Sequence, residues 1–264
     1  MTKAVVCGAL GRMGKSILRL SLEYSDFQVV AGVEHPDCIR SYDLGEASGI
    51  EELKGLPLTS RLEEVLGLCD VVIEFSGNTT VAVSHGKLSA LAGKGVVIGT
   101  TGFKEHELEE LKSYSEQAPI LVSPNMSLGV NLLFRLVEIA SNVLKGRGFD
   151  AEVLEIHHRY KKDAPSGTAL KLEEILLRTM NLQKRVHCRD GIAPRELEEV
   201  GVMSLRGGDV VGEHTVYFFG FGERLELTHR ASSRDIFAKG AIEAARWIKG
   251  KKPGWYSMFD VLGL

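Results

Sequence analysis

The sequence predicts an α/β protein with a doubly wound, Rossmann-type parallel-sheet domain and a second, α+β domain with a mixed sheet. In the first half, short runs of β-branched and aliphatic residues alternate with amphipathic segments, which is typical of a parallel sheet covered on both faces. Later strand-like segments follow one another, the last two through a hairpin-type turn, which indicates a mixed sheet. A last amphipathic segment, 235–249, is expected to return to the first domain. We therefore expect one domain over 1–126 and 235–264, and a second over 127–234.

Composition limits the classes of function. With 264 residues, 44% hydrophobic and 25% charged, the chain can build one large or two modest cores. A net charge of −3 and no run of 18 apolar residues favour neither a nucleic-acid nor a membrane partner. No secretory or transit pattern is visible, so we expect a cytoplasmic protein, or one of the plastid stroma if the source is a plant. Four scattered cysteines predict reduced, mostly buried thiols and no metal site.

The first element is a strand over 3–7, followed by a glycine-rich turn, Gly8–Gly14, and an amphipathic helix. A second strand, 28–34, ends at Glu34. Glycines at 8, 11 and 14 suit a tight turn that lets a pyrophosphate approach a helix N-terminus. The strand–turn–helix–strand context with a terminal carboxylate is typical of dinucleotide binding. The alternative is a glycine turn needed only to pack the helix on the sheet.

The acidic residue at the end of the second strand bears on the choice of cofactor. The carboxylate of Glu34 can accept a hydrogen bond from a ribose 2′-hydroxyl and repels a 2′-phosphate, which favours NADH. Arg12, Lys15 and His35 are near enough in sequence to offset that repulsion. We therefore expect NADH, NADPH or both as cofactors.

The alternation continues with a helix over 61–68, a strand over 70–75, a helix over 79–92, a strand over 96–99, a helix over 105–116 and a strand over 120–122. Ligands of doubly wound sheets bind beyond the carboxyl ends of the strands. This selects the loops 75–78, 99–103 and 123–126, where Thr100 and Thr101 could hydrogen-bond a nicotinamide amide. The alternative for each loop is an ordinary strand-to-helix turn with capping hydroxyls.

The central stretch 155–168 concentrates the groups that carry chemistry. Read as a strand over 153–160, it would place His157 and His158 on opposite faces, unless the strand ends between them. Pro165 can open a helix, so that Ser166, Gly167 and Thr168 would lie at its N-terminus, where an anion such as a carboxylate is favoured. The alternative is an ordinary helix cap beside exposed histidines and solvated lysines.

Before this stretch we expect a helix over 127–144. After it the sequence predicts a polar segment over 182–199, strands over 202–205, 210–211, 215–219 and 224–230, and a hairpin turn at 220–223.

Five motifs together resemble the dihydrodipicolinate reductase family, now called 4-hydroxy-tetrahydrodipicolinate reductases, of bacterial and plant lysine biosynthesis. They are His-His-Arg-Tyr-Lys-Lys-Asp-Ala-Pro-Ser-Gly-Thr-Ala at 157–169, Gly-x-x-Gly-Arg-Met-Gly at 8–14, Gly-Thr-Thr-Gly-Phe at 99–103, Arg-Gly-Gly-Asp-x-x-Gly-x-His at 206–214 and Ala-Ser-Ser-Arg at 231–234. The match spans almost the whole chain. It implies reduction of 4-hydroxy-tetrahydrodipicolinate to tetrahydrodipicolinate in the diaminopimelate route to lysine.

The resemblance also implies roles for individual residues. His157 would be the proton donor and acceptor, Lys161 a second proton donor, and His158 a substrate-binding residue. The turn at Ser166, Gly167 and Thr168 would hold a carboxylate of a small cyclic dicarboxylate substrate. Cofactor contacts would come from Gly8, Ala9, Leu10, Gly11, Arg12, Met13, Glu34, Gly99, Thr100, Thr101, Ser123, Pro124, Asn125 and Met126.

The family commonly forms homotetramers through the sheet of its second domain, so the resemblance implies a homotetramer. Some members have arginine directly after the acidic ribose-binding residue, where this chain has His35, so the cofactor preference stays open.

Two other functions fit parts of the pattern. One is another NAD(P)-dependent enzyme, such as an amino-acid or semialdehyde dehydrogenase. The other is a dinucleotide sensor without catalysis. The cluster of two histidines and a lysine argues against a sensor, because sensing needs no proton donor.

Overall fold

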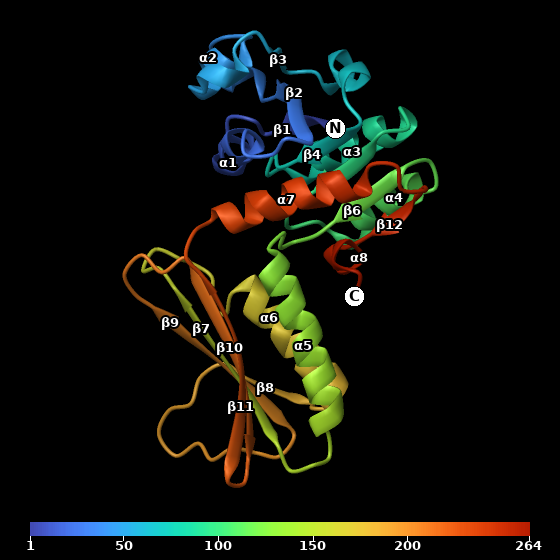
Figure 1. Cartoon of the computed structure of the whole chain (residues 1–264). Coiled ribbons are helices and arrows are strands. Elements are labelled where there is room, and N and C mark those ends of the chain that lie inside the picture. Colours follow the sequence, from blue (N-terminus) through green and yellow to red (C-terminus); the bar gives the residue numbers. More distant parts are fainter. The chain divides into compact units, whose positions relative to one another are not determined.

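The computed structural model describes residues 1–264, which divide into two compact units (Figure 1). The first comprises Met1–Leu128 and Asp235–Leu264, and the second comprises Gly129–Arg234. Each unit contains one β-sheet, of seven strands in the first and five in the second. The predicted fold class, a parallel doubly wound domain with a second mixed-sheet domain, is confirmed.

The sheet of the first unit is parallel and has the order β12-β6-β5-β4-β1-β2-β3. Its strands are β1 (Thr2–Cys7), β2 (Phe27–Val33), β3 (Leu58–Thr59), β4 (Val71–Glu74), β5 (Gly95–Ile98), β6 (Pro119–Val122) and β12 (Gly254–Tyr256). The chain builds outward from β1 in both directions, through β2 and β3 on one side and β4 to β6 on the other. The switch between β1 and β4 is where sheets of this class bind ligands, beyond the carboxyl ends of the strands.

Helices cover both faces of this sheet. They are α1 (Arg12–Ser21), α2 (Leu44–Ser48), α3 (Thr79–Leu91), α4 (Glu105–Tyr114), α7 (Asp235–Ile248) and α8 (Met258–Leu262). Along β1, Ala4 and Val6 join a core cluster with α1 and α7, whereas Val5 and Cys7 join a second cluster with α3 and α4. This division follows from the alternation of side chains along a strand. It explains why the buried strands are apolar throughout.

Several short elements of the first unit differ from expectation, and the short helices α2 and α8 were not predicted. The predicted helix over 61–68 is wrong: the segment forms two 3₁₀ turns, Leu62–Glu64 and Leu66–Leu68. A helix of two turns that contains Gly67 gains too few backbone hydrogen bonds to persist as an α-helix. Strands β3 and β12 were not predicted, because two or three residues carry no readable alternation.

The sheet of the second unit is mixed and has the order β11-β10-β7-β9-β8. Strands β7, β9 and β8 pair in parallel, and β10 pairs antiparallel with β7 and β11. The elements are α5 (Leu128–Leu144), β7 (Asp150–His157), α6 (Gly167–Met180), β8 (Lys184–Val186), β9 (Glu199–Arg206), β10 (Gly212–Gly220) and β11 (Glu223–Ala231). The predicted hairpin is confirmed, with Gly222 at φ +84° in its turn. No separate strand forms at 210–211.

Strand β7 ends earlier than predicted, at His157 and not at Tyr160. Beyond it the main chain turns, since Arg159 N–H donates to the Gly208 carbonyl at 3.2 Å and Lys161 N–H donates to the His158 carbonyl at 3.1 Å. His158 therefore leaves the alternation of the strand. Strand β8 was missed because its residues are mostly polar and lie at the sheet edge.

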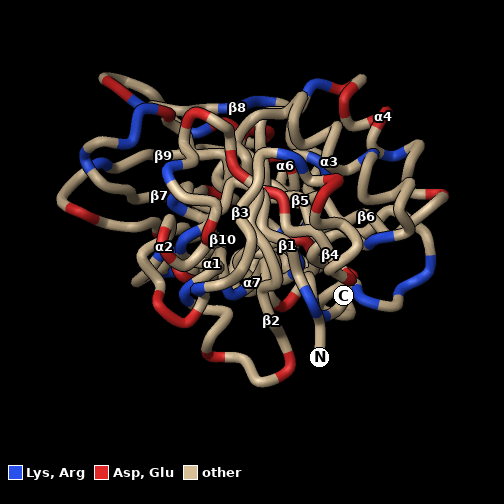
Figure 2. The backbone as a smooth tube through the Cα atoms, turned by 90° about the horizontal axis from the view of Figure 1, so that it is seen from above, with Lys and Arg blue, Asp and Glu red and all other residues tan.

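All four cysteines are free thiols. Cys7 and Cys69 are buried as predicted, but Cys38 and Cys188 are exposed, so the expectation of mostly buried thiols is wrong for half of them. None of the helices has the length and apolar character needed to cross a membrane. Acidic and basic residues are interspersed along the chain (Figure 2).

Candidate active site

The glycine-rich turn after β1 is shaped first by packing. Gly8 has φ +72°, and a Cβ there would lie 2.4 Å from the Phe75 carbonyl oxygen. A Cβ on Gly14 would lie 2.1 Å from the Gly8 carbonyl oxygen. Gly11 is less confined, with the Gly8 oxygen 3.2 Å from its would-be Cβ. Packing alone thus accounts for two of the three glycines, and the motif does not by itself establish nucleotide binding.

The N-terminus of α1 is suited to an anion. Gly11 is the N-cap residue and supplies no side-chain hydrogen bond, and the first turn contains no acidic residue. The first amide groups of an α-helix have no acceptor within the helix, so they and the helix dipole favour a negatively charged ligand. The predicted contacts from Gly8 to Met13 all lie in this turn.

Glu34 follows β2 beside the same turn. Its Oε2 accepts a hydrogen bond from Leu10 N–H at 2.8 Å and its Oε1 accepts one from His35 N–H at 2.9 Å. The Glu34 N–H donates to the Thr59 carbonyl at 3.0 Å, which ties the residue to the end of β3. The carboxylate is therefore held in place. Each oxygen keeps a further lone pair that can accept from a ribose hydroxyl.

A cavity of about 380 Å³ opens at the switch point and is lined by Gly8, Glu34 and Ser76 from the ends of β1, β2 and β4. It also includes Asn78 from the predicted loop 75–78, and residues that were not predicted, namely Ser60, Arg61, Leu62, Glu63, Val81, Ser84, His85 and Leu88. No sequence pattern indicated that Ser60 and Arg61 belong to the site, because they follow strand β3, which was not predicted. Two shallower hollows, one at Met1 and one at Leu264, contain none of the predicted cofactor residues. The turn, the carboxylate and the cavity together fit a nicotinamide dinucleotide.

The loops after β4 and β5 are joined by a buried network. Thr100 is 3% exposed, and its hydroxyl accepts from Gly77 N–H at 3.2 Å and donates to Glu74 at 3.4 Å. Glu74 also accepts from Ser76 N–H at 2.6 Å. The hydroxyl of Thr100 is thus engaged within the protein, whereas Thr101 is exposed. A Cβ on Gly99 would meet the Phe75 ring at 2.1 Å, which explains this glycine by packing.

The loop after β6 is similarly self-contained. Ser123 donates from its hydroxyl to the Asn125 carbonyl at 2.8 Å, and Asn125 accepts on Oδ1 from Ser127 N–H at 2.9 Å. Met126 is 2% exposed and belongs to the hydrophobic core, whereas Pro124 is exposed. The loop can offer a ligand Pro124 and main-chain groups, but not the Met126 side chain.

A donor cluster beneath the cavity bears on the expectation of no metal. The ligand atoms of Cys7, Glu74 and His85 lie within 4.8 Å of one another. His85 Nδ1 lies 2.5 Å from Glu74 Oε2, so these two groups already pair directly. Burial, followed by the charge of Glu74, raises the pKa of the Cys7 thiol. The direct pairing of Glu74 with His85 supports the loop after β4, where Glu74 also accepts from Ser76 N–H.

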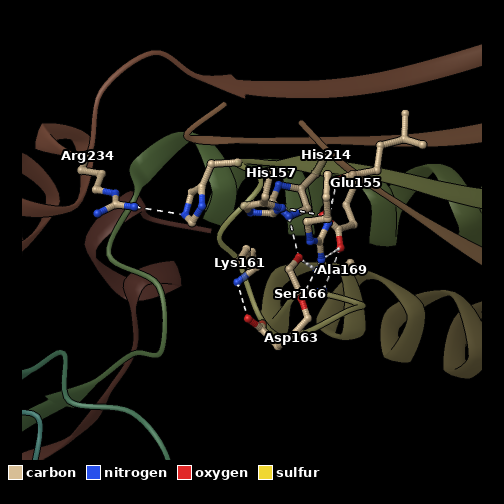
Figure 3. A network of polar contacts seen from close by, with 11 residues as sticks. Glu155, His157, Lys161, Asp163, Ser166, Ala169, His214 and Arg234 are labelled. Carbon is tan, nitrogen blue, oxygen red and sulfur yellow. Dashed lines mark hydrogen bonds and ion pairs between the residues drawn. The ribbon is translucent and has the colours of Figure 1, made fainter. Parts of the chain in front are cut away.

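In the second unit, His157 closes β7 and pairs with Glu155, two residues earlier on the same face (Figure 3). His157 Nδ1 lies 2.5 Å from Glu155 Oε2. Glu155 is fully buried, and it also accepts two hydrogen bonds from Arg206, at 2.7 and 2.8 Å, and one from Ser166 N–H at 3.1 Å. Burial alone would raise the pKa of Glu155, but the hydrogen bonds from His157, Arg206 and Ser204 outweigh it and lower that pKa. The carboxylate is therefore ionised and fixes one ring nitrogen of His157.

Glu155 was not predicted as a site residue, although the alternation of β7 places it on the face of His157. The other ring nitrogen of His157, Nε2, faces Gly212, where an added Cβ would approach it to 2.9 Å. Only glycine leaves room for the imidazole there. The motif at 206–214 thus contributes Arg206 and Gly212 to the surroundings of His157.

Ser166 connects a second histidine to the start of α6. Its hydroxyl accepts from Ala169 N–H at 3.2 Å as the helix N-cap, and it lies 2.9 Å from His214 Nε2. His214 packs edge-on against His157 with ring centroids 5.1 Å apart. Burial, reinforced by the charge of His157, lowers the pKa of His214 to about 3. His214 is therefore neutral at neutral pH. It ends the motif at 206–214, but no role was predicted for it.

The remaining predicted residues flank this network. Arg234 Nη2 lies 3.2 Å from His158 Nε2, and Lys161 Nζ lies 2.9 Å from Asp163 Oδ1. Desolvation and the positive charge of Arg234 lower the pKa of His158. Figure 3 shows Lys161 turned toward Asp163. No atom lies within 4 Å of a Cβ placed on Gly167, so the first residue of α6 is open to a ligand.

The structure thus gathers the predicted substrate and proton-transfer residues at the N-terminus of α6 in the second unit. It gathers the predicted cofactor residues at the carboxyl ends of the strands in the first unit. The first group places an open helix N-terminus beside a histidine paired with a carboxylate, and the second places the Glu34 carboxylate beside the glycine-rich turn.

Comparison with known proteins decides the family. The family model described as dihydrodipicolinate reductase, N-terminus, matches residues 2–126, and the one described as dihydrodipicolinate reductase, C-terminus, matches residues 129–262. The chain belongs to the dihydrodipicolinate reductase family. The resemblance seen in the sequence is confirmed, and with it the prediction of an NAD(P)H-dependent oxidoreductase.

Relatives of this reductase family cover the whole chain. A 4-hydroxy-tetrahydrodipicolinate reductase of Aquifex aeolicus (strain VF5) is 68% identical over 262 residues, covering 99% of each chain. The enzyme of the same name from Myxococcus xanthus (strain DK1622) is 46% identical and covers 100% of this chain and 98% of its own. The dipicolinate-bound dihydrodipicolinate reductase from Paenisporosarcina sp. TG-14 shares the fold, with a TM-score of 0.81 at 22% identity and 98% coverage of each chain.

Proposed function

We propose that the chain reduces 4-hydroxy-tetrahydrodipicolinate to tetrahydrodipicolinate with NADH or NADPH, as the reductive step of the diaminopimelate route to lysine. The observation that carries the proposal is the Glu155–His157 pair beside the open N-terminus of α6, in a chain of the dihydrodipicolinate reductase family. A carboxylate-bearing substrate and an acid–base group are thus accommodated side by side.

The reaction consumes one hydride and one proton and releases one water. A nicotinamide, when bound by the first unit, supplies the hydride. His157 supplies or takes up the proton, because Glu155 fixes its Nδ1 and leaves Nε2 as the exchanging nitrogen. Lys161 serves as the second proton donor once it leaves Asp163.

Substrate orientation falls to the turn that opens α6. The turn at Ser166, Gly167 and Thr168 would hold one carboxylate of the cyclic substrate through the main-chain N–H groups of Gly167 and Thr168 and the helix dipole, while the Ser166 N–H stays bonded to Glu155. His158, paired with Arg234, would bind the second carboxylate. Two anchored carboxylates fix the plane of the ring, which is the condition for hydride transfer to one defined carbon.

We further propose a cytoplasmic homotetramer. Four free thiols suit a reducing compartment. In the second unit, one sheet face carries six partly exposed apolar side chains among charged ones such as Glu152 and Glu226; the apolar side chains are Leu154, Ile156, Met203, Leu205, Tyr217 and Phe219. The edge strand β11 extends beside them with nine residues. Exposed apolar side chains next to a long edge strand favour association with further copies.

The test is a coupled assay in which a synthase forms the substrate from aspartate semialdehyde and pyruvate. We expect oxidation of NADH, NADPH or both, which is measured as the loss of reduced-nicotinamide absorbance. Binding of either cofactor without turnover would indicate a sensor instead. Turnover only with an amino acid or a free semialdehyde would indicate a different dehydrogenase.

A further inference from the structure

The cavity beside Glu34 contains one lysine or arginine among all its lining residues, Arg61. Arg12 and Lys15, the cations suggested by the sequence, do not line it. The other charged or titratable residues at its wall are Glu34, Glu63, His35 and His85. Arg61 is therefore the one permanent positive charge that faces a ligand in this cavity.

The main chain holds Arg61 next to Glu34. Thr59 accepts a hydrogen bond from Glu34 N–H at 3.0 Å through its carbonyl, and its hydroxyl accepts from Arg61 N–H at 3.2 Å. The same hydroxyl donates to Glu64 at 2.6 Å, which fixes the turn after β3. The ribose carboxylate and the arginine thus share Thr59 as a common anchor.

The guanidinium of Arg61 itself is not committed. Its ion pair with Glu64 spans 3.7 Å between side chains that are 68% and 51% exposed. Exposed pairs of this length contribute little, so the side chain can turn to a better anion at small cost. A guanidinium matches a phosphate with two parallel hydrogen bonds, which a histidine or a lysine does not provide.

We propose that Arg61 determines the choice between NADPH and NADH by binding the 2′-phosphate of the adenosine ribose. The fixed carboxylate of Glu34 accepts from the 2′-hydroxyl of NADH and repels the phosphate of NADPH. Arg61, anchored one strand away, offsets that repulsion. This inference rests on the proposed function, because it assumes that the cavity holds the adenosine half of a nicotinamide dinucleotide.

The test measures dissociation constants of NADH and NADPH by fluorescence titration for the wild type, Arg61→Gln and Arg61→Lys. We expect Arg61→Gln to weaken NADPH binding at least ~10-fold and to change NADH binding by less than ~2-fold, since only the phosphate loses its partner. Arg61→Lys keeps the positive charge without the two parallel N–H donors, so its NADPH dissociation constant should lie between those of the wild type and Arg61→Gln. Added salt should weaken NADPH binding more in the wild type than in Arg61→Gln.

Arg40→Gln is the matched control, because Arg40 is exposed and does not line the cavity. An NADPH-to-NADH ratio in Arg61→Gln equal to that of the wild type and of Arg40→Gln would overturn the inference while leaving the reductase function intact. Equal loss of both cofactors in Arg61→Gln would overturn it as well. A wild type that binds neither cofactor would overturn the proposed function itself, and this inference with it.

Discussion

At the scale of single residues, the proposed proton transfer depends on His157 and Lys161. Removing either group should leave the dinucleotide contacts of the first unit untouched, because both residues belong to the second. We expect His157→Ala and Lys161→Ala each to lower turnover at least ~100-fold, which is within the usual range for a positioned acid or base, with NADH affinity nearly unchanged. Stopped-flow turnover and fluorescence titration check the two quantities.

Lys162→Ala is the control for that experiment, since Lys162 is an exposed neighbour without a proposed role. Turnover at the level of the wild type in both His157→Ala and Lys161→Ala would remove these side chains from the mechanism.

A buried histidine makes the second unit sensitive to acid. The pKa of His214 is lowered to about 3, mainly by burial, whereas an unfolded histidine titrates near ~6.5. Between these values the unfolded chain binds a proton that the folded chain does not, so the free energy of unfolding falls as the pH drops below ~6.5. From pH ~7.5 to pH ~5 this amounts to about 2 kcal/mol.

His214→Gln keeps a hydrogen-bonding group near Ser166 and removes the titration. We expect urea unfolding of this variant to lose about 2 kcal/mol less over the same pH interval than the wild type. The lowered pKa of Glu155 acts at lower pH, below ~4.5, and does not interfere. Parallel pH profiles for His214→Gln, the wild type and the exposed-site control His106→Gln would contradict the assignment.

At the scale of elements, helix α1 packs closely against the turn before it, and Gly14 is the residue of the helix that allows this contact. Alanine normally stabilises a helix interior by about 1 kcal/mol relative to glycine. Here the added Cβ would lie 2.1 Å from a main-chain oxygen, which cannot rotate away. We expect Gly14→Ala to lower the free energy of unfolding by about 2 kcal/mol and to weaken NADH binding, because α1 must shift from the turn. Urea unfolding and cofactor titration give both values.

Gly67→Ala provides the comparison, since no atom lies within 4 Å of a Cβ built at Gly67. Its unfolding free energy should stay within about 0.5 kcal/mol of the wild type. Equal stability of Gly14→Ala and Gly67→Ala would show that the turn yields more readily than its geometry indicates.

The sequence predicted elements well where they are long and periodic. The parallel strands and the helices α1, α3, α5, α6 and α7 follow from apolar spacing that local sequence carries. Strands β3 and β8 were not predicted, because their pairing is decided by neighbours distant in the chain. Arg61 was not predicted as a site residue for the same reason, since its place beside Glu34 comes from β3 and not from any motif.

The site shows the same division between local and distant information. Motif residues such as His157 and Ser166 could be named from the sequence, and the structure brings them together. The hydrogen bonds around His157 and Ser166 are completed by Glu155 from β7, Arg206 from β9 and His214 from β10. Only the register of the sheet brings these three residues to the site. Strand β7 ends at His157 because the main chain at 157 and 159 forms hydrogen bonds with residues 207 and 208. No local sequence pattern predicts these bonds.

At the scale of the whole molecule, the proposed homotetramer can be tested on the open sheet face of the second unit. Leu205 is 52% exposed there despite its apolar side chain. We expect light scattering of the wild type to give four times the chain mass of 28.9 kDa, and Leu205→Glu to give a smaller species, because a buried unpaired carboxylate is costly. Leu22→Glu, at a comparably exposed leucine of the first unit, should remain assembled. A fully assembled Leu205→Glu would direct attention to another surface.

The first unit is discontinuous in the chain, and this has a consequence for biosynthesis. Its core cluster takes Ala241, Ile242 and Ile248 from α7 and Met258 from α8, which a ribosome delivers last. Until then one apolar face of the first unit's sheet is covered by α1 but not by α7, whereas the contiguous second unit can fold earlier. A nascent chain halted after residue 234 should therefore be a good substrate for chaperones and proteases, even though most of its strands have already been synthesised.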